Sequence, residues 1–270
     1  MFELIPVLAL DPLFRLPFVT GLLLAGLLPV LGAVLTLRQE WLAALGLAHL
    51  AAASALIGLA AGLPAVLGGT LGALLAGAVK ALLRACGNAA YAFMILIGWS
   101  AMLLVAANSA VGDSLGHAII DGQLYFAGLT ELLLSLLLVA IAAHRLPWLM
   151  PLILRATFFP CFETANRRPA WRWRLGLDLL TAASLAVATA TLGLMGAFAL
   201  VFVPAWIAFR LAPSWRWTLI LAALIGGGVY LAAFLAALAL DQPFGPVLVA
   251  LLVAGAGLTA LIGIGRSSAT

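Results

Sequence analysis

A few ionisable side chains in this chain are of the kinds that bind divalent transition metals. His49 lies within a long apolar run, where an ionisable group is costly and usually faces a bundle interior or a wet path. Its neutral imidazole would suit Zn²⁺ and would tolerate other transition metals. The alternative is a histidine that hydrogen-bonds a neighbouring helix for packing. His49 is therefore the leading candidate for a metal ligand, with the packing role left open.

The other candidates are carboxylates and one further histidine. Glu131 is expected about two turns into the apolar run Leu124–Ile141, as a metal-attracting carboxylate or as one paired within the bundle. Asp113, His117 and Asp121 share one loop, with His117 four positions from each aspartate. On a helix this spacing would place all three on one face, where they could attract a cation. The other interpretation is an ordinary solvated loop.

The composition indicates that these residues are positioned by membrane-spanning elements. Of the 270 residues, 66% are hydrophobic and only 8% are charged, whereas soluble domains carry about 25% charged residues. A water-soluble domain of this size could not bury so much apolar surface. The net charge of +4 is spread over many short loops, which is a membrane-topology pattern and not a sign of nucleic-acid binding.

The apolar runs predict an all-α polytopic transmembrane helix bundle of about 8–9 spans, since each span needs about 20 apolar residues. Trp41–Val79 is too long for one helix and is divided at Gly62–Pro64. Gly176–Phe209 is also too long, and Gly193 and Gly196 suggest two short spans or one span with a re-entrant piece. The other expected spans are Leu16–Leu37, Asn88–Asn108, Leu124–Ile141, Trp217–Leu238 and Pro246–Ile264.

Lys and Arg residues indicate the orientation of the spans. They occupy alternate loops, and only Arg15 falls on the other side. Because cytoplasmic loops are enriched in these residues, the C-terminus and the loop Ala156–Trp173 are expected in the cytoplasm. With nine spans the N-terminus would lie outside.

The longest polar interruption on the expected cytoplasmic side is Thr157–Arg174. A short helix there would carry Glu163 in its first turn, where a carboxylate suits the helix dipole, and Pro169 would end it. Phe162 and Ala165 would share one face and could dock in a groove on a cytoplasmic partner. The alternative is an amphipathic helix anchored at the lipid headgroups by its Arg and Trp residues.

Two polar residues near this surface are expected to have structural roles. Asp178 lies four residues after Arg174, so the two are expected to form an ion pair and not a metal site. His144 lies beside Arg145 and is expected at the membrane interface.

Four stretches of sequence follow one another in a characteristic order: VLGAVLTLRQEWLAALGLAHLAAASALIG, FETANRRPAWRWRLGLDLL, a run containing Pro204–Ala205, and LALDQPFGPVLVALLVAGAGL. Together they resemble the zinc/manganese ABC-importer permease family. The Ala-His pair lies on the second span, and the stretch with Glu163, Ala165 and Asp178 lies where the family has its coupling helix. The similarity spans most of residues 16 to 265.

The resemblance implies a fold like that of type II ABC importers, formed by residues 1–270 as one permease domain with a coupling loop at about residues 156–174. It implies a homodimer in the inner (plasma) membrane. A separate cytoplasmic ATPase would bind Phe162, Glu163 and Ala165, and an extracytoplasmic metal-binding protein would deliver the ion. The chain has no GxxxxGK[ST] phosphate loop, so it is not expected to be an enzyme or to hold a cofactor of its own.

Departures from the family pattern affect the choice of ion. The family often has an aspartate one turn before the histidine of the second span, and here that position is Leu45. The acidic residue that commonly opens the fourth span is replaced near Asn88, and no carboxylate clearly aligns at the start of the fifth span. A histidine without a neighbouring aspartate is a softer environment, which favours zinc, with manganese as the alternative.

Two other classes of function are compatible with the composition. The first is an ATP-independent secondary transporter or channel, which inverted repeats would favour; no convincing repeat relates the halves of the chain. The second is a membrane scaffold that transports nothing, which the scarcity of charges within the spans would allow. Removal of an ATPase partner separates the classes, because a secondary transporter would keep working.

Overall fold

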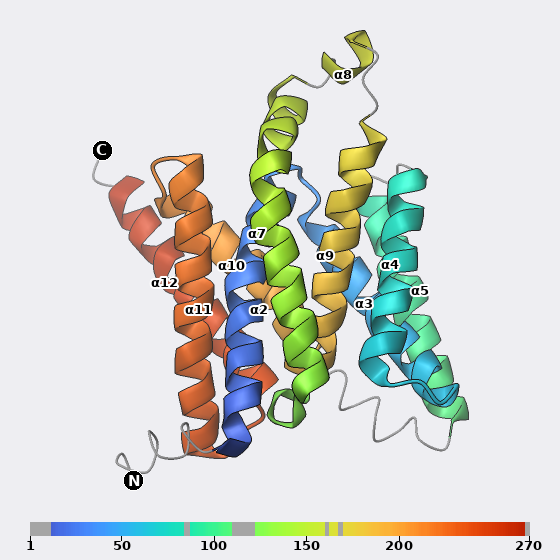
Figure 1. Cartoon of the computed structure of the whole chain (residues 1–270). Helices are drawn as coiled ribbons and strands as arrows, with labels where there is room; N and C mark the ends of the chain where they lie inside the picture. The colour runs from blue at the N-terminus through green and yellow to red at the C-terminus, as the bar shows by residue number, and fades with distance from the viewer. Residues whose placement is uncertain (1–11, 84–86, 110–121, 160–161, 167–169, 268–270) are drawn as a thin grey trace.

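The computed structural model of the chain describes residues 12–83, 87–109, 122–159, 162–166 and 170–267. All regular elements in these ranges are helices (Figure 1). The first part of the chain forms α2 (Pro12–Leu37), α3 (Trp41–Ala60), α4 (Ala65–Leu82), α5 (Asn88–Asn108) and the 3₁₀ helix η1 (Leu124–Phe126). The second part forms α7 (Leu129–Phe158), α8 (Phe162–Ala165), α9 (Trp171–Leu192), α10 (Leu194–Leu211), α11 (Trp215–Leu240) and α12 (Phe244–Ser267).

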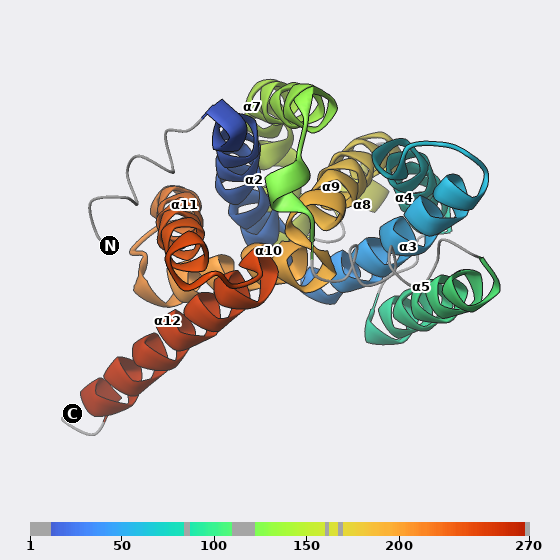
Figure 2. The same ribbon diagram turned by 90° about the horizontal axis from the view of Figure 1, so that it is seen from below.

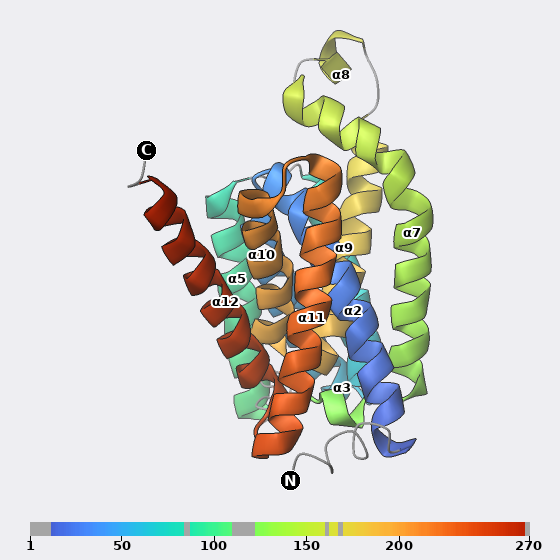
Figure 3. The same ribbon diagram turned by 90° about the vertical axis from the view of Figure 1, so that its left-hand side faces the viewer.

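The predicted all-α membrane bundle is confirmed. In the described ranges, nine helices are long and apolar enough to cross a membrane. Successive long helices run in opposite directions, so α8 and the last turns of α12 lie at one end and the start of α2 lies at the other (Figures 1 and 3). We call these the α8 end and the opposite end.

The two expected breaks in the long apolar runs occur where glycine permits a backbone that other residues disfavour. Gly62 has a φ of 81° between α3 and α4, and Pro64 directly precedes α4. Gly193 has a φ of 83° and joins α9 directly to α10. Positive φ is readily adopted by glycine because it has no β-carbon. Of the two options left open for residues 176–209, two spanning helices is the one found.

The fifth span differs from its prediction at both ends. It was expected to run from Leu124 to Ile141, but residues 124–126 form η1, and α7 begins at Leu129 and continues to Phe158. The helix passes through Pro147 and Pro151, which bend a helix without necessarily ending it. Its last turns lean over the α8 end (Figure 3). The expected coupling loop at residues 156–174 is shorter, because α7 covers residues 156–158 and α9 covers residues 171–174.

The centre of the bundle is formed by α2, α3, α9 and α10, which are the most buried spans (Figure 2). The spans α5, α7, α11 and α12 lie around them and are mostly exposed. Exposed large side chains on the outer helices include Leu104, Leu137 and Leu224. Such surfaces suit contact with lipid hydrocarbon, because apolar side chains that face lipid do not incur the free-energy cost of exposure to water.

Glycines allow the central helices to approach closely. A β-carbon on Gly32 of α2 would overlap the carbonyl group of Val201 in α10. A β-carbon on Gly98 of α5 would lie 2.6–2.8 Å from atoms of His49 in α3. Small residues at such crossings are typical of membrane helix packing, where dispersion contacts drive association. The position of His49 within the bundle therefore depends on a glycine.

The close approach of α2 and α10 gives a testable consequence. Gly32→Ala is expected to lower the melting temperature and the membrane abundance of the protein, because overpacking costs about 1–3 kcal/mol. Gly26→Ala on the same helix is the matched control, since a β-carbon there has no atom within 4 Å. Thermal unfolding of both variants in detergent measures the difference. Equal melting temperatures would contradict the packing described for α2 and α10.

Candidate functional site

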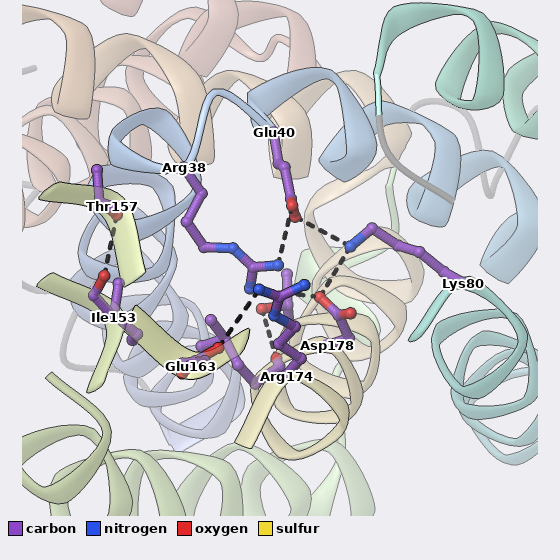
Figure 4. Close-up of polar contacts among 10 residues, drawn as sticks. Arg38, Glu40, Lys80, Ile153, Thr157, Glu163, Arg174 and Asp178 are labelled. Atoms are coloured by element: carbon purple, nitrogen blue, oxygen red, sulfur yellow. Dashed lines mark hydrogen bonds and ion pairs between the residues drawn. The ribbon is translucent and has the colours of Figure 1, made fainter. Parts of the chain in front are cut away.

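Four charged side chains gather at the α8 end (Figure 4). Lys80 of α4 donates hydrogen bonds to Glu40, in the turn between α2 and α3, at 3.0 Å and to Asp178 of α9 at 2.9 Å. Arg38 donates to Glu40 at 2.9 Å, and another nitrogen of its guanidinium lies 3.7 Å from Asp178. All four side chains are at least nine-tenths buried. We call Arg38, Glu40, Lys80 and Asp178 the ion cluster.

The ion cluster balances its charges internally. Burying a charge is costly unless a partner compensates it, and here two cations face two carboxylates. The helices that carry Lys80 and Asp178 also touch through their backbones, since a β-carbon on Gly77 would lie 3.1 Å from the carbonyl oxygen of Asp178. The cluster thereby fixes the α2–α3 turn against α4 and α9.

The expected pairing of Asp178 with Arg174 is wrong. Asp178 pairs with Lys80 and Arg38, whereas Arg174 lies 3.6 Å from Glu163 of α8. The Arg174 side chain is 40% exposed and can stay hydrated. A buried ammonium such as that of Lys80 cannot, so its need for a carboxylate outweighs helical spacing.

The ion cluster was not recognised from the sequence. In the sequence, Lys80 and Arg38 indicate only the orientation of the spans, and no pattern assigns a role to Glu40. Lys80 and Asp178 are 98 residues apart, a separation at which no local spacing rule applies. The available signals are Glu40 and Asp178, two acidic residues among the cations expected on one side of the membrane.

The helix α8 projects beyond the spans (Figures 1 and 3). It confirms the short helix expected here with Glu163 in its first turn; Pro169 lies outside the described residues. Glu163 is buried and accepts a hydrogen bond of 2.8 Å from the indole nitrogen of Trp173. The guanidinium of Arg155 lies 4.5 Å from the centre of the Phe162 ring. Ala165 is exposed.

His49 lies in the middle of α3 and is 6% exposed. Its Nδ1 lies 2.9 Å from the carbonyl oxygen of Leu45. Because a carbonyl only accepts, Nδ1 carries the proton, which leaves Nε2 with a free lone pair in the neutral ring. Such a nitrogen can bind a metal ion, and the backbone hydrogen bond orients the ring. Among the described residues no group of three or more His, Cys, Asp or Glu could hold a metal ion.

Glu131 lies in the first turn of α7 and not two turns into it. Its carboxylate accepts a hydrogen bond of 2.8 Å from the backbone nitrogen of Gly128, so it caps the helix. A carboxylate does therefore open the fifth span, although the sequence comparison placed none there. Glu131 also lines a pocket of about 190 Å³ at the opposite end, together with Gln123 and Thr191.

The region around this pocket is anchored by Tyr125. Its ring contacts Phe14 and Phe234, and its hydroxyl is buried without a hydrogen-bond partner in the described structure. Burial raises the pKa of Tyr125 to about 12, so the hydroxyl stays protonated. The ring serves packing and carries no charge toward the pocket.

The predicted site residues do not form one centre. His49 lies ten residues along α3 from Leu59, which lines the Glu131 pocket, a separation of about 15 Å along the helix axis. Asp113, His117 and Asp121 lie outside the described residues. The described candidates are therefore an imidazole in the middle of α3, a carboxylate at the opposite end and the short helix α8.

In the described part of the chain, nine helices are long and apolar enough to cross a membrane, and one short helix projects at one end, which is the architecture of a polytopic membrane protein. The chain belongs to the ABC 3 transport family, whose model matches residues 11–262. The family predicted from the sequence is thus confirmed. Membership favours the permease of an ABC transporter over an ATP-independent transporter.

Solved structures share the fold. A chain of PsaBC from Streptococcus pneumoniae, solved in complex with Fab, superposes with a TM-score of 0.81 at 14% identity, covering 96% of this chain and 95% of that chain. An ABC transporter described as of the metal-chelate type, in an inward-facing conformation, superposes with a TM-score of 0.70 at 14% identity, covering 91% and 84%. No curated protein matches the chain.

The ion cluster gives a second testable consequence. Lys80→Met is expected to destabilise the protein by about 3–5 kcal/mol, because it leaves a buried carboxylate without its ammonium partner. Lys80→Met combined with Asp178→Asn keeps the Arg38–Glu40 pair and should recover most of that loss. Thermal unfolding of the purified variants tests this. A double variant less stable than Lys80→Met would contradict the compensation described.

Proposed function

We propose that the chain is the permease subunit of an ATP-driven importer for a divalent transition metal, with zinc as the ion and manganese as the alternative. The observation that carries the proposal is the lone pair of His49 Nε2, held in the middle of a central span of an ABC permease. The fold shared with a transporter described as of the metal-chelate type supports the substrate class.

The surroundings of His49 suit an ion in transit. Leu45 offers only its backbone oxygen, and that oxygen already accepts from Nδ1. A site with few ligands holds an ion weakly, and weak binding permits release. An imidazole without a neighbouring carboxylate favours zinc over the harder manganese ion.

The α8 end is proposed to face the cytoplasm. Cations gather at that end: Arg38 directly follows α2, and Lys80, Arg155, Arg174 and Arg210 lie in helix segments there. Cytoplasmic loops are enriched in such residues. In this proposal the last turns of α12 lie in the cytoplasm, the start of α2 lies outside, and the membrane is the inner (plasma) membrane.

A separate ATPase is proposed to dock on α8. The exposed Ala165 and the half-buried Phe162 offer surface to a partner, whereas Glu163 turns inward to Trp173. Glu163 is thus proposed to hold the docking helix in place, while Phe162 and Ala165 contact the ATPase. The exposed Asn166 extends this surface.

An extracytoplasmic metal-binding protein is proposed to deliver the ion to the opposite end. The Glu131 pocket offers a carboxylate there, and the predicted cation-attracting residues Asp113, His117 and Asp121 precede η1 in the sequence. A second copy of the chain would complete the permease, as the sequence resemblance implies. The mostly exposed outer helices leave area for both that copy and lipid.

The proposal predicts ATP-dependent uptake in sealed proteoliposomes that contain the permease and its ATPase. With binding protein loaded with Zn²⁺ or Mn²⁺ outside, ATP on the ATPase side should drive accumulation of Zn²⁺. Accumulation of Mn²⁺ alone would select the alternative ion. Absence of ATP-dependent flux of either ion in a fully assembled complex would contradict the proposal.

His49→Ala is expected to reduce uptake severalfold without lowering membrane abundance, because alanine keeps the β-carbon that packs on Gly98 but removes the ring nitrogen. His144→Ala is the matched control, since His144 is an exposed histidine of α7. Uptake and abundance are measured in the same vesicles. Full transport by His49→Ala would remove His49 from the pathway.

A further inference from the structure

The attachment of α8 to the rest of the bundle relies on a small set of side-chain contacts. Trp173 donates to Glu163 at 2.8 Å, Arg174 approaches Glu163 at 3.6 Å, and Arg155 lies over Phe162. Two of these contacts converge on one buried carboxylate. The position of α8 therefore depends strongly on what holds Glu163.

Trp173 joins α8 to the ion cluster. Its side chain is 8% exposed, and the guanidinium of Arg38 lies 5.6 Å from the centre of its ring. Cations over an indole face are attracted to its negative potential, more strongly when both groups are desolvated. The same indole donates its N–H to Glu163 on α8. One aromatic ring thus contacts both the projecting helix and the buried charges.

The contacts continue from Arg38 through the ion cluster. Arg38 pairs with Glu40 and Asp178, and Lys80 bridges both of these carboxylates. Figure 4 shows these side chains converging between α4, α9 and the α2–α3 turn. Glu40 directly precedes α3, the helix that carries His49 nine residues further on. The series of side-chain contacts that begins at Glu163 therefore reaches the start of α3.

The end of α7 offers a less direct route between α8 and this region. A pocket of about 310 Å³ lies between α7 and the cluster, with Ile153 and Thr157 on one side and Arg38 and Trp173 among the residues lining it. Elsewhere α7 packs against α2 and α9 and also contacts α8, so it is a second connection between α8 and the bundle. The contact through Trp173 is the one that reaches Arg38 and the ion cluster through side chains.

We infer that Trp173 and Arg38 are positioning residues that hold the coupling helix α8 against the ion cluster and so link ATPase movement to α3. The inference rests on the proposed function for its transport part and on geometry alone for its positioning part. Because they are in contact, Glu163 and Trp173 are expected to move together, and so are Trp173 and Arg38. The ion cluster in turn moves with the α2–α3 turn, which carries Glu40. Movement of α8 by the ATPase is then passed to the helix of His49.

The positioning part is tested on the permease alone. Spin labels at Ala165 of α8 and at Leu83, which follows α4, report their separation by pulsed electron resonance, after Cys86 and Cys161 are replaced by serine. Trp173→Phe keeps an aromatic ring but removes the indole N–H. Loss of a hydrogen bond to a charged group should raise the undocked population of α8 about tenfold, which broadens the distance distribution.

Trp215→Phe is the matched control, because Trp215 is a tryptophan at the same end whose indole nitrogen has no hydrogen-bond partner in the described structure. Its distance distribution should equal that of the parent protein. A parent-like distribution for Trp173→Phe would overturn the positioning role.

The transport part is tested in proteoliposomes with the ATPase and the loaded binding protein. Trp173→Phe should lower the number of ions taken up per ATP hydrolysed severalfold while the ATPase still copurifies, and Trp215→Phe should not. Arg38→Lys, which keeps the charge but loses the planar group over the indole, should have the same effect. An unchanged number of ions taken up per ATP in Trp173→Phe would overturn the proposed link between ATPase movement and α3.

A double-mutant cycle tests whether the two residues act in series. Combining Arg38→Lys with Trp173→Phe should add little to either change alone, since coupled residues are non-additive. If the double variant lowers the number of ions taken up per ATP by the product of the two single effects, the two residues act independently and the proposed series of contacts is overturned. If the parent complex shows no ATP-dependent uptake, the proposed function fails, and the distance measurement alone then decides the positioning role.

Discussion

The buried ammonium of Lys80 constrains the whole α8 end of this protein. It can be tolerated there only with carboxylates in contact, and Glu40 and Asp178 come from segments far apart in the sequence. Once those carboxylates are in place, Arg38 completes the neutral cluster and lies against Trp173. The end of α4, the α2–α3 turn and the start of α9 are thus fixed by one electrostatic requirement.

This arrangement combines a rigid cluster with a weakly attached projecting helix. The ion cluster is buried among packed spans, whereas α8 is only four residues long and depends on contacts at Glu163 and Phe162. A partner that grips α8 therefore acts on the least constrained element at that end. His49 lies on a helix that begins at the cluster, so the structure connects the projecting helix with the middle of the membrane.

The sequence predicted the spans well because apolar length and the glycine and proline breaks are local signals, as at Gly62 and Gly193. It misjudged the fifth span because Arg145 ends the apolar run while the helix continues through Pro147. The ion cluster could not be predicted from local sequence patterns, because the Lys80–Asp178 contact joins residues 98 positions apart. Spacing alone favoured Arg174 as the partner of Asp178, because helical geometry carries no information about burial.

We propose that the α8 end receives the ATPase and transmits its movement. A photoreactive amino acid at Ala165, compared with one at the highly exposed Phe126 of the opposite end, tests it most directly in the assembled complex. The ATPase is expected to crosslink to position 165 and not to position 126. Crosslinking of the ATPase at position 126 without any at position 165 would contradict it.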